Sequence, residues 1–302
     1  MAINLNAKYE DMDRVVKSNF AAALANGAYA ARSLPILEEV DSKSLSEDYN
    51  WMLDTAGFQR LKQNLPVRTA IEKRVTIVNE PWVDNLTVDL RTMKTEQRGK
   101  YELTATMMGR KVGRFIDNQV QNLLGASGKA FTENSWDGVP FFSASHPMAA
   151  GTTHSNLIGG GGSPWFLFDT SVIKPMILQW LERPYTEPFG PDTEWSKNNR
   201  EVKWDFHHDM GLGMTLFWFA VASKATLTEE HFQDAMTAAM ATPTYELHEG
   251  AAQSMGVLPN LLVVGRSNKL AAEKILKATM NDGGGSNVLA GSCELLVLPS
   301  LP

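Results

Sequence analysis

The sequence predicts an α+β protein, with helices and strands grouped in separate stretches of the chain. Apolar residues recur at helical spacing over 97–124, alternate with polar residues over 71–92, and form aromatic-rich runs typical of strands over 164–224. Of the 302 residues, 43% are hydrophobic and 21% are charged. This balance favours a folded chain of one large domain, or two intimate ones, over a disordered chain.

The composition argues against several kinds of partner. The formal net charge of −6 disfavours a tight, sequence-independent grip on nucleic acid, which needs clustered Lys and Arg, but it is compatible with enclosing DNA. No apolar run approaches the roughly 20 residues that span a bilayer, and the first residues lack the layout of a signal peptide. We therefore expect no membrane contact and synthesis in the cytoplasm. Cys293 is the only cysteine, which excludes an intrachain disulfide and a cysteine-based zinc site.

The first 70 residues are expected to form an arm that lies over other structure. Residues 8–32 have the spacing of an amphipathic helix, and Gly27 and then Pro35 are expected to end it. A mixed, acidic stretch follows. A short helix is predicted over 58–65, where Pro66 stops it.

Residues 71–92 predict a β-hairpin, because apolar and polar residues alternate on both sides of the turn signal Asn79-Glu80-Pro81. The alternating apolar residues are Val75, Ile77, Leu86, Val88 and Leu90. An isolated two-stranded hairpin is marginal in water, so its apolar face needs cover. From the residues alone, cover by the chain's own body is the simpler interpretation, and cover by a neighbouring molecule is the alternative.

A long helix is predicted over 97–124, which at ~1.5 Å per residue would measure about 40 Å. Its apolar stripe consists of Met108, Val112, Phe115, Ile116, Val120, Leu123 and Leu124. Gly109 and Gly113 lie inside the helix, where each costs ~1 kcal/mol relative to alanine. Close approach of another strand or helix is the favoured reason for them, and a place to bend is the alternative.

The remaining chain alternates between loops, strands and helices. Residues 126–163 are rich in turn signals, and their glycine run at 159–162 lacks the GK[ST] of a phosphate loop. Thr226 and Glu229 have capping-box spacing ahead of a helix that ends near Met240. A strand at 261–264, a helix over 268–280, a glycine-rich loop at 281–286 and a strand over 294–298 are predicted to follow.

Two histidine clusters invite a chemical interpretation. His207 and His208 are adjacent in a predicted strand and so point to opposite faces, which makes a shared metal ion improbable. We expect one to be buried and hydrogen-bonded and the other to face solvent. His146 lies near Ser143 and Ser145, but no nucleophile elbow accompanies them. A loop histidine bonded to a backbone carbonyl is the simpler expectation.

Two further features favour a packed core over chemistry. Cys293 lacks the cationic neighbours of a reactive thiol and is expected to be a small buried residue. Five of the eight tryptophans fall in 164–224, where they are expected to fill a core, with a glycan-binding platform as the alternative. We therefore expect a structural or binding role, with no catalytic residues, no cofactor and no metal.

Several stretches resemble the Mu-like phage major head subunit (gpT) family, and the order of elements resembles the HK97-type capsid fold. They are YNW (49–51), RVTIVNEPWVDNLTVDL (74–90), MGRKVGRFIDNQVQNLL (108–124), WDGVPFFSASHP (136–147), WFLFDTS (165–171) with KPMILQ (174–179), NLLVVGRSNKLAAEKIL (260–276) and GGGSNVLAGSCELLVLPSL (283–301). Each stretch is short, but together they span most of the chain. In the family, the WFLFDTS block follows the LLVLPSL-like strand. Here it precedes that strand, so the segment order is expected to be permuted.

The resemblance implies a division of the chain. Its parts are an N-terminal arm (1–70), an extended loop (71–96), a spine helix with peripheral domain (97–163), an aromatic-rich β segment of that domain (164–224), and an axial domain with the final strand (225–302). In this scheme the hairpin lies over an adjacent subunit, and the interpretation of its apolar face shifts to a contact between subunits. Gly109 and Gly113 would be points where the spine helix flexes.

The resemblance also implies a function: a major capsid protein whose hexamers and pentamers form the icosahedral head of a tailed bacteriophage around double-stranded DNA. The subunit-interface candidates are Arg74, Val75, Ile77, Trp82, Asp84, Leu86, Val88 and Leu90, with Trp82 as an anchor at the hairpin tip and Arg74 and Asp84 in ion pairs. Implied partners are a portal, a separate scaffold, a protease and decoration proteins, the scaffold because the arm begins almost at Met1. A bacterial nanocompartment shell and a glycan-binding module are the alternatives.

Overall fold

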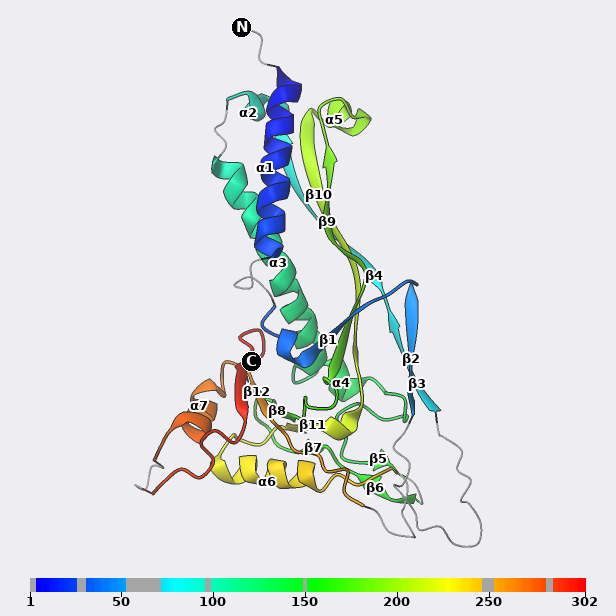
Figure 1. Cartoon of the computed structure of the whole chain (residues 1–302), viewed down its shortest axis with the longest axis vertical. Coiled ribbons are helices and arrows are strands. Elements are labelled where there is room, and N and C mark those ends of the chain that lie inside the picture. The colour runs from blue at the N-terminus through cyan, green and yellow to red at the C-terminus, as the bar shows by residue number, and fades with distance from the viewer. Residues whose placement is uncertain are drawn as a thin grey trace.

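The computed structural model describes residues 4–25, 31–52, 72–95, 99–148, 151–245, 253–280 and 285–302. They form a tall, narrow upper part and a broader lower part, and one long helix, α3 (Gly99–Leu124), runs from the first into the second (Figure 1). The mixture of helices and strands is the predicted α+β class. No helix among these residues is long and apolar enough to cross a lipid bilayer.

A four-stranded sheet extends along the upper part. Its strands lie in the order β1 (Leu37–Asp41), β9 (Met176–Phe189), β10 (Glu201–Met214) and β4 (Glu80–Asp89). β1 is parallel to β9 and the other pairs are antiparallel. β9 and β10 form a long hairpin that carries α5 (Glu194–Asn199) at its far end (Figure 1).

The character of β9 changes along its length. Its first five residues, 176–180, are all buried, and the remainder alternates between half-buried and exposed positions. Between the pairs Tyr185–His207 and Glu182–Asp209, two residues of β9, one of them Pro184, face a single residue of β10. Such a bulge bends and twists a strand, and proline, which has no N–H to donate, is tolerated there. The β9–β10 hairpin thus starts in the lower core and continues into the upper part, where it forms the middle of the four-stranded sheet.

Helices cover one face of the sheet in the upper part. α1 (Leu5–Ala25) lies against the upper half of α3, and α2 (Leu90–Thr95) follows β4 near the top (Figure 1). Met12, Val16 and Phe20 of α1 are buried with residues of α3 and β10. The predicted helix therefore exists, and its apolar face lies over other elements of its own chain. The division that makes 1–70 an N-terminal arm stays a prediction.

The lower part is built on a five-stranded sheet in the order β13 (Glu294–Val297), β12 (Leu261–Val264), β8 (Trp165–Phe168), β11 (Ala220–Ser223) and β7 (Leu157–Ile158). α6 (Glu229–Met240) and α7 (Lys269–Lys277) pack on one face of it. The other face joins the core that contains the lower half of α3. Smaller elements are the 3-10 helices η2 (Leu34–Ile36) and η4 (Phe217–Phe219), α4 (Lys129–Thr132), and the pair β5 (His146–Pro147) and β6 (Thr153–His154).

The predicted hairpin over 71–92 is wrong in its pairing. β3 (Glu72–Val78) pairs with β2 (Ser46–Met52), and β4 pairs with β10 more than 100 residues away. Asn79 links the two strands and is buried, so it is no exposed turn. The alternating pattern identified both strands, but alternation contains no information about the partner of a strand.

The structure also divides the 164–224 segment, which was expected to be one β unit. β8 and β11 belong to the five-stranded sheet, whereas β9 and β10 belong to the four-stranded one. Trp165, Trp204 and Trp218 are fully buried, as the core-packing interpretation predicted. The short helix predicted at 58–65 lies outside the described residues, as does most of the glycine loop at 281–286.

Candidate functional site

β2 and β3 form a separate two-stranded ribbon, here called the ribbon (46–52 and 72–78). Figure 1 shows it at the side of the molecule, next to the lower end of the four-stranded sheet. Asp48 of β2 contacts two residues of β3: it accepts a hydrogen bond from the Thr76 hydroxyl (2.6 Å) and forms an ion pair with Arg74 (3.4 Å). Neither outer edge of the ribbon pairs with another strand in the part of the chain that the structure describes.

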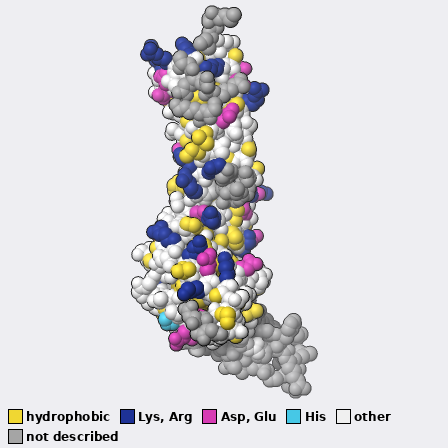
Figure 2. Space-filling model, turned by 90° about the vertical axis from the view of Figure 1, so that its left-hand side faces the viewer, with side chains coloured by type: hydrophobic (Ala, Val, Ile, Leu, Met, Phe, Trp, Pro, Cys, Tyr) yellow, Lys and Arg dark blue, Asp and Glu magenta, His cyan; other side chains and the backbone are white. Residues whose placement is uncertain are grey.

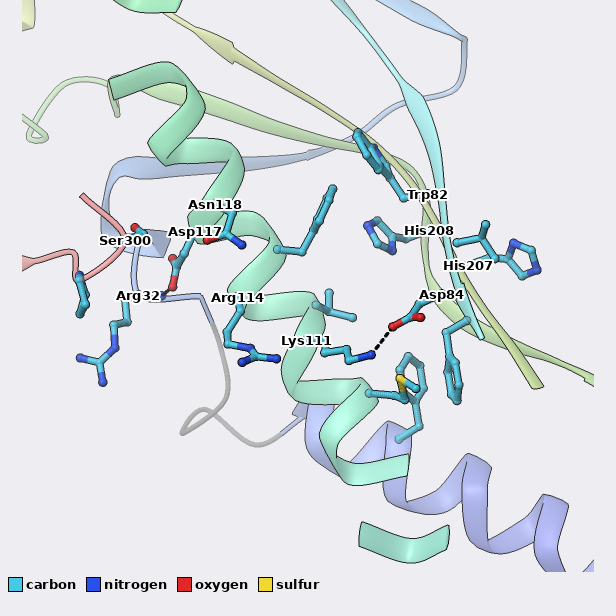
Figure 3. Close-up of a pocket in the computed structure, with 17 residues that line it drawn as sticks. Arg32, Trp82, Asp84, Lys111, Arg114, Asp117, Asn118, His207, His208 and Ser300 are labelled. Carbon is cyan, nitrogen blue, oxygen red and sulfur yellow. Dashed lines mark hydrogen bonds and ion pairs between the residues drawn. The ribbon is translucent and has the colours of Figure 1, made fainter. Parts of the chain in front are cut away.

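A groove between α3 and the sheet is the second prominent surface feature, a cavity of about 910 Å³. Trp82 and Phe115 line it with ring centroids 4.6 Å apart. Figure 3 shows Lys111 of α3 pointing across the cavity at Asp84 of β4, and the two groups form an ion pair of 2.7 Å. The groove is therefore lined by the aromatic pair Trp82–Phe115 and by the ion pair Lys111–Asp84.

The eight interface candidates from the sequence do not form one surface. Arg74, Val75 and Ile77 lie on β3, the next four candidates lie on β4, and Leu90 begins α2. Ile77 and Val88 are buried within the chain. Their apolar side chains are thus covered by the chain itself, as the simpler interpretation of the alternating pattern held.

Trp82 lies elsewhere than expected, and the two charged candidates form ion pairs within the chain. Trp82 lies within β4, opposite His208, and is not at a hairpin tip. Arg74 and Asp84 each have an ion-pair partner within the chain, Asp48 and Lys111. All four charged side chains are at least 40% exposed, so these pairs contribute little to stability.

The two helix glycines lie where α3 meets other elements. A Cβ on Gly109 would lie 2.6 Å from the Cβ of Ala23 and 3.0 Å from the carbonyl oxygen of Phe20, both in α1. Gly113 is buried and lines a cavity that Leu24 and Leu34 also line. For Gly109 the structure supports the close-approach interpretation. A role of either glycine in flexing stays a prediction.

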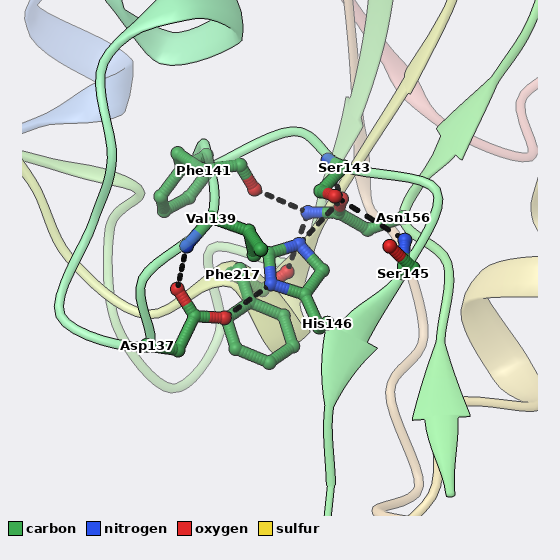
Figure 4. A network of polar contacts seen from close by, with 8 residues as sticks. All are labelled: Asp137, Val139, Phe141, Ser143, Ser145, His146, Asn156 and Phe217. Atoms are coloured by element: carbon green, nitrogen blue, oxygen red, sulfur yellow. Dashed lines mark hydrogen bonds and ion pairs between the residues drawn. The ribbon is translucent and has the colours of Figure 1, made fainter.

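His146 belongs to a sealed polar network (Figure 4). Asn156 donates to the Phe141 carbonyl (2.8 Å) and accepts from the Ser143 N–H (2.9 Å), so its oxygen faces His146 Nε2 at 3.0 Å. Nε2 must therefore carry a hydrogen. The other ring nitrogen lies 2.6 Å from Asp137, and both of these side chains are at most 2% exposed.

This network excludes the hydrolase interpretation of His146. Both ring nitrogens are used, and the ring stacks on Phe217 with centroids 3.7 Å apart. The expected backbone-carbonyl partner is wrong, since the partners are the side chains of Asp137 and Asn156. The network joins the loop that contains Asp137 and Ser143 to β5 and to the segment between β6 and β7. A histidine without a free nitrogen or solvent access cannot act as a general base.

The other chemical candidates are also structural. His207 and His208 turn to opposite sides of β10 (Figure 3), but both are half-buried, and His208 Nε2 has no hydrogen-bond partner among the described residues. Burial, and then the nearby His207, lower the pKa of His208. No group of three metal-capable side chains occurs among the residues described. Burial raises the pKa of the Cys293 thiol to about 11, which leaves it unreactive.

Comparison with known proteins agrees with the architecture. The sequence model of the family described as Mu-like prophage major head subunit gpT matches residues 9–301. A search of curated proteins finds no match. The family match is a single span, so it does not require the permuted order expected for 164–224, which stays a prediction.

Solved structures of bacteriophage JBD30 show the same fold. A chain of its procapsid is 24% identical, with 97% of each chain covered and a TM-score of 0.76. A chain of its capsid is 15% identical, with 92% of this chain and 94% of that chain covered and a TM-score of 0.78. A chain of its capsid decorated with minor capsid protein trimers is 18% identical, with coverages of 90% and 91% and a TM-score of 0.72.

These likenesses confirm the predicted HK97-type capsid fold. The family match covers almost the whole chain and describes a structural component of the phage head. The chain therefore belongs to the Mu-like prophage major head subunit gpT family and is a major capsid protein, a structural subunit of the virion shell and not an enzyme.

Proposed function

We propose that the ribbon provides a principal contact between copies of this head subunit. The observation that carries this proposal is a two-stranded ribbon at the side of the molecule that has no third strand beside it among the described residues. Two strands alone are marginal in water and gain stability when a further surface covers them. Arg74 and Val75 are the interface candidates on this ribbon that are not buried in the subunit. In the assembled shell, the neighbouring copy supplies the cover.

The shell then grows from rings of six and five subunits into an icosahedral head. Repeated head-to-tail contacts that close into rings suit a ribbon of one copy resting on the body of the next. Each contact can be modest, because many copies engaging at once make the shell stable. In this arrangement the upper part has the peripheral role and the five-stranded lower part the axial role. Trp82, Asp84 and Leu86, at or near the groove, are candidates to receive the neighbour.

The head encloses double-stranded DNA without reading its sequence. On the face in Figure 2, Lys and Arg side chains are spread along the length of the molecule between acidic and apolar ones and do not gather in one patch. A net charge of −6 agrees with this distribution. Containment therefore rests on the closed shell and not on tight phosphate binding. A portal, a scaffold, a protease and decoration proteins complete the head, which is assembled in the host cytoplasm.

Excision of the end of the ribbon tests this proposal. Tyr49 and Val75 are paired across the ribbon, so an Asn-Gly turn between them removes 50–74, which includes the outer residues of both strands, and leaves the base of the ribbon paired. We expect the shortened subunit to keep the circular dichroism and the unfolding midpoint of the full chain. It should remain a single subunit in size-exclusion chromatography and form no shells in negative-stain microscopy, whereas the full chain forms them in parallel. Shells of normal size from the shortened chain would refute the proposal.

A further inference from the structure

A buried polar cluster lies at the base of the ribbon, where it meets the four-stranded sheet. Ser42, Asn79 and Gln179 have exposed fractions of 7%, 5% and 0%. Asn79 directly follows the second strand of the ribbon, Ser42 precedes the first, and Gln179 comes from β9. We call these three residues the ribbon anchor. It joins segments that are up to 137 residues apart in the chain.

Gln179 holds both strands of the ribbon at once. Its amide nitrogen donates to the Ile77 carbonyl (3.0 Å) and to Asn79 Oδ1 (2.8 Å), and its amide oxygen accepts from the Tyr49 hydroxyl (2.9 Å). Ile77 and Tyr49 lie on opposite strands of the ribbon. Because a backbone carbonyl can only accept, the orientation of the Gln179 amide is fixed.

Asn79 completes the cluster on the other side. Its side-chain nitrogen donates to Ser42 Oγ (3.0 Å) and to the Ser44 carbonyl (2.8 Å), and its backbone N–H donates to the Leu45 carbonyl (2.8 Å). Ser42 in turn donates its backbone N–H to the Trp180 carbonyl (2.8 Å). Every amide hydrogen of the Asn79 and Gln179 side chains therefore has an acceptor.

Two glycines of β10 let the ribbon lie directly on the sheet. A Cβ on Gly211 would be 2.6 Å from the Val78 carbonyl oxygen and 3.0 Å from Gln179 Nε2. A Cβ on Gly213 would be 2.5 Å from Ile77 Cδ1. A side chain at position 211 would collide with the backbone of the ribbon, and one at position 213 would collide with the side chain of Ile77.

The chemistry of this contact differs from ordinary core packing. Apolar side chains bury an element without fixing its direction, whereas a fully satisfied polar network accepts one geometry and excludes others. Here the network holds the base of the ribbon, whereas the proposed contact with the neighbouring copy lies further out along the ribbon. A small change of angle at the base becomes a large displacement at the end.

We propose that the ribbon anchor, together with Gly211 and Gly213, sets the angle at which the ribbon leaves the body and thereby the geometry of the contact between subunits. The anchor residues are positioning residues: they act through the ribbon and do not touch the neighbouring copy. This inference rests on the proposed role of the ribbon in assembly. It adds that the curvature of the shell depends on residues inside the subunit.

The first test replaces Gln179 with leucine (Q179L), which keeps the volume and removes the hydrogen bonds. The matched control is Asn287→Leu, because Asn287 is also buried and donates to carbonyls, Ile275 and Ala278 at 2.8 Å, but lies in the lower part beside α7. In the unassembled subunit, Q179L should speed hydrogen exchange of the ribbon amides at least tenfold relative to those of β12, and the control should not. Q179L should form no shells, or shells of scattered diameter, while the control forms shells of the normal diameter.

A second pair of variants keeps every polar bond. Gly213→Ala should shift the ribbon and alter shell diameter, and Gly213→Ala with Ile77→Ala should restore it, because the second change removes the atoms that the new methyl group meets. This pair decides the matter if Q179L does not fold. Unchanged ribbon exchange and normal shells from Q179L would overturn the proposal, as would failure of the double variant to recover the diameter.

The two proposals fail in different ways. If the chain with the shortened ribbon still forms shells, the ribbon's role in assembly is wrong, whatever Q179L does. If shortening abolishes shells but Q179L leaves exchange and diameter unchanged, the ribbon's role stands and the anchor has no positioning role.

Discussion

Replacing Gly109 with alanine measures how closely α1 and α3 approach each other. On an isolated helix this change is favourable by ~1 kcal/mol, because glycine is the poorer helix former. In the folded subunit, the new Cβ would lie 2.6 Å from Ala23 Cβ and 3.0 Å from the Phe20 carbonyl oxygen. Carbon atoms normally approach to about 3.5–4 Å, so the contact is about 1 Å too short.

No rotamer change can relieve this contact, because a Cβ and a backbone oxygen are fixed to their helices. Overpacking of this kind costs about 1–3 kcal/mol, and subtracting the gain in helix propensity of ~1 kcal/mol leaves a net loss of up to about 2 kcal/mol. For a chain of this size that corresponds to a fall in the unfolding midpoint of up to roughly 8 °C. Gly109→Ala should therefore destabilise the subunit, although propensity alone predicts the opposite.

The assay is urea and thermal unfolding of the dissociated subunit, with Ala23→Gly as the compensating change. Ala23→Gly removes the atom that the new methyl group meets, so the double variant should regain most of the lost stability, with a coupling energy of at least about 1 kcal/mol. Stabilisation by the single variant, without coupling to Ala23, would refute close packing. That result would instead favour the alternative that the helix glycines are points where α3 bends.

Three smaller predictions concern single groups. Burial, and then the charge of the neighbouring His146, lower the pKa of His154 to about 4. As the pH falls from about 6.5 to 4, the unfolded chain therefore binds a proton at this position that the folded chain does not, and the stability of the subunit should fall. His154→Gln should reduce this dependence on pH, measured by urea unfolding at pH 7, 6 and 5. The Cys293 thiol, with its pKa raised to about 11, should resist a disulfide reagent in the folded subunit and react promptly in urea. The exposed Lys111–Asp84 pair should show less than about 1 kcal/mol in a double-mutant cycle, and a larger value would mean that the groove is drier than its exposure indicates.

The sequence predicted which segments form helices and strands better than it predicted their partners. The stripe of α3 and the buried run of β12 are local patterns, and both elements lie within a few residues of their expected bounds. The pairing of β4 with β10 depends on residues more than 100 positions away, which alternation cannot encode. Asn79 shows the difficulty, since an asparagine before Glu-Pro is typical of a turn, yet here it is a buried donor.

Small errors have equally local causes. Thr226 was expected to cap α6, but the cap is Thr228, whose hydroxyl accepts from the His231 N–H, while the Thr226 carbonyl faces the His231 ring. Spacing alone cannot decide which of two threonines, two positions apart, is the cap. The role of Gln179 could not have been found from the sequence, because a glutamine in the apolar run MILQW has no local signal for a partner in the ribbon.

The long helix α3 takes part in two cores. Its upper half is buried against α1 and β10, and its lower half packs in the core that contains β8 and the start of β9. A break in the middle of the helix would therefore disturb both cores together. Copies that occupy slightly different surroundings in one head should thus have the same arrangement of α3 and its two cores. Structural differences between copies should be confined to the ribbon and the surface loops. Superposing all copies of a head on α3 and its two cores would test this expectation.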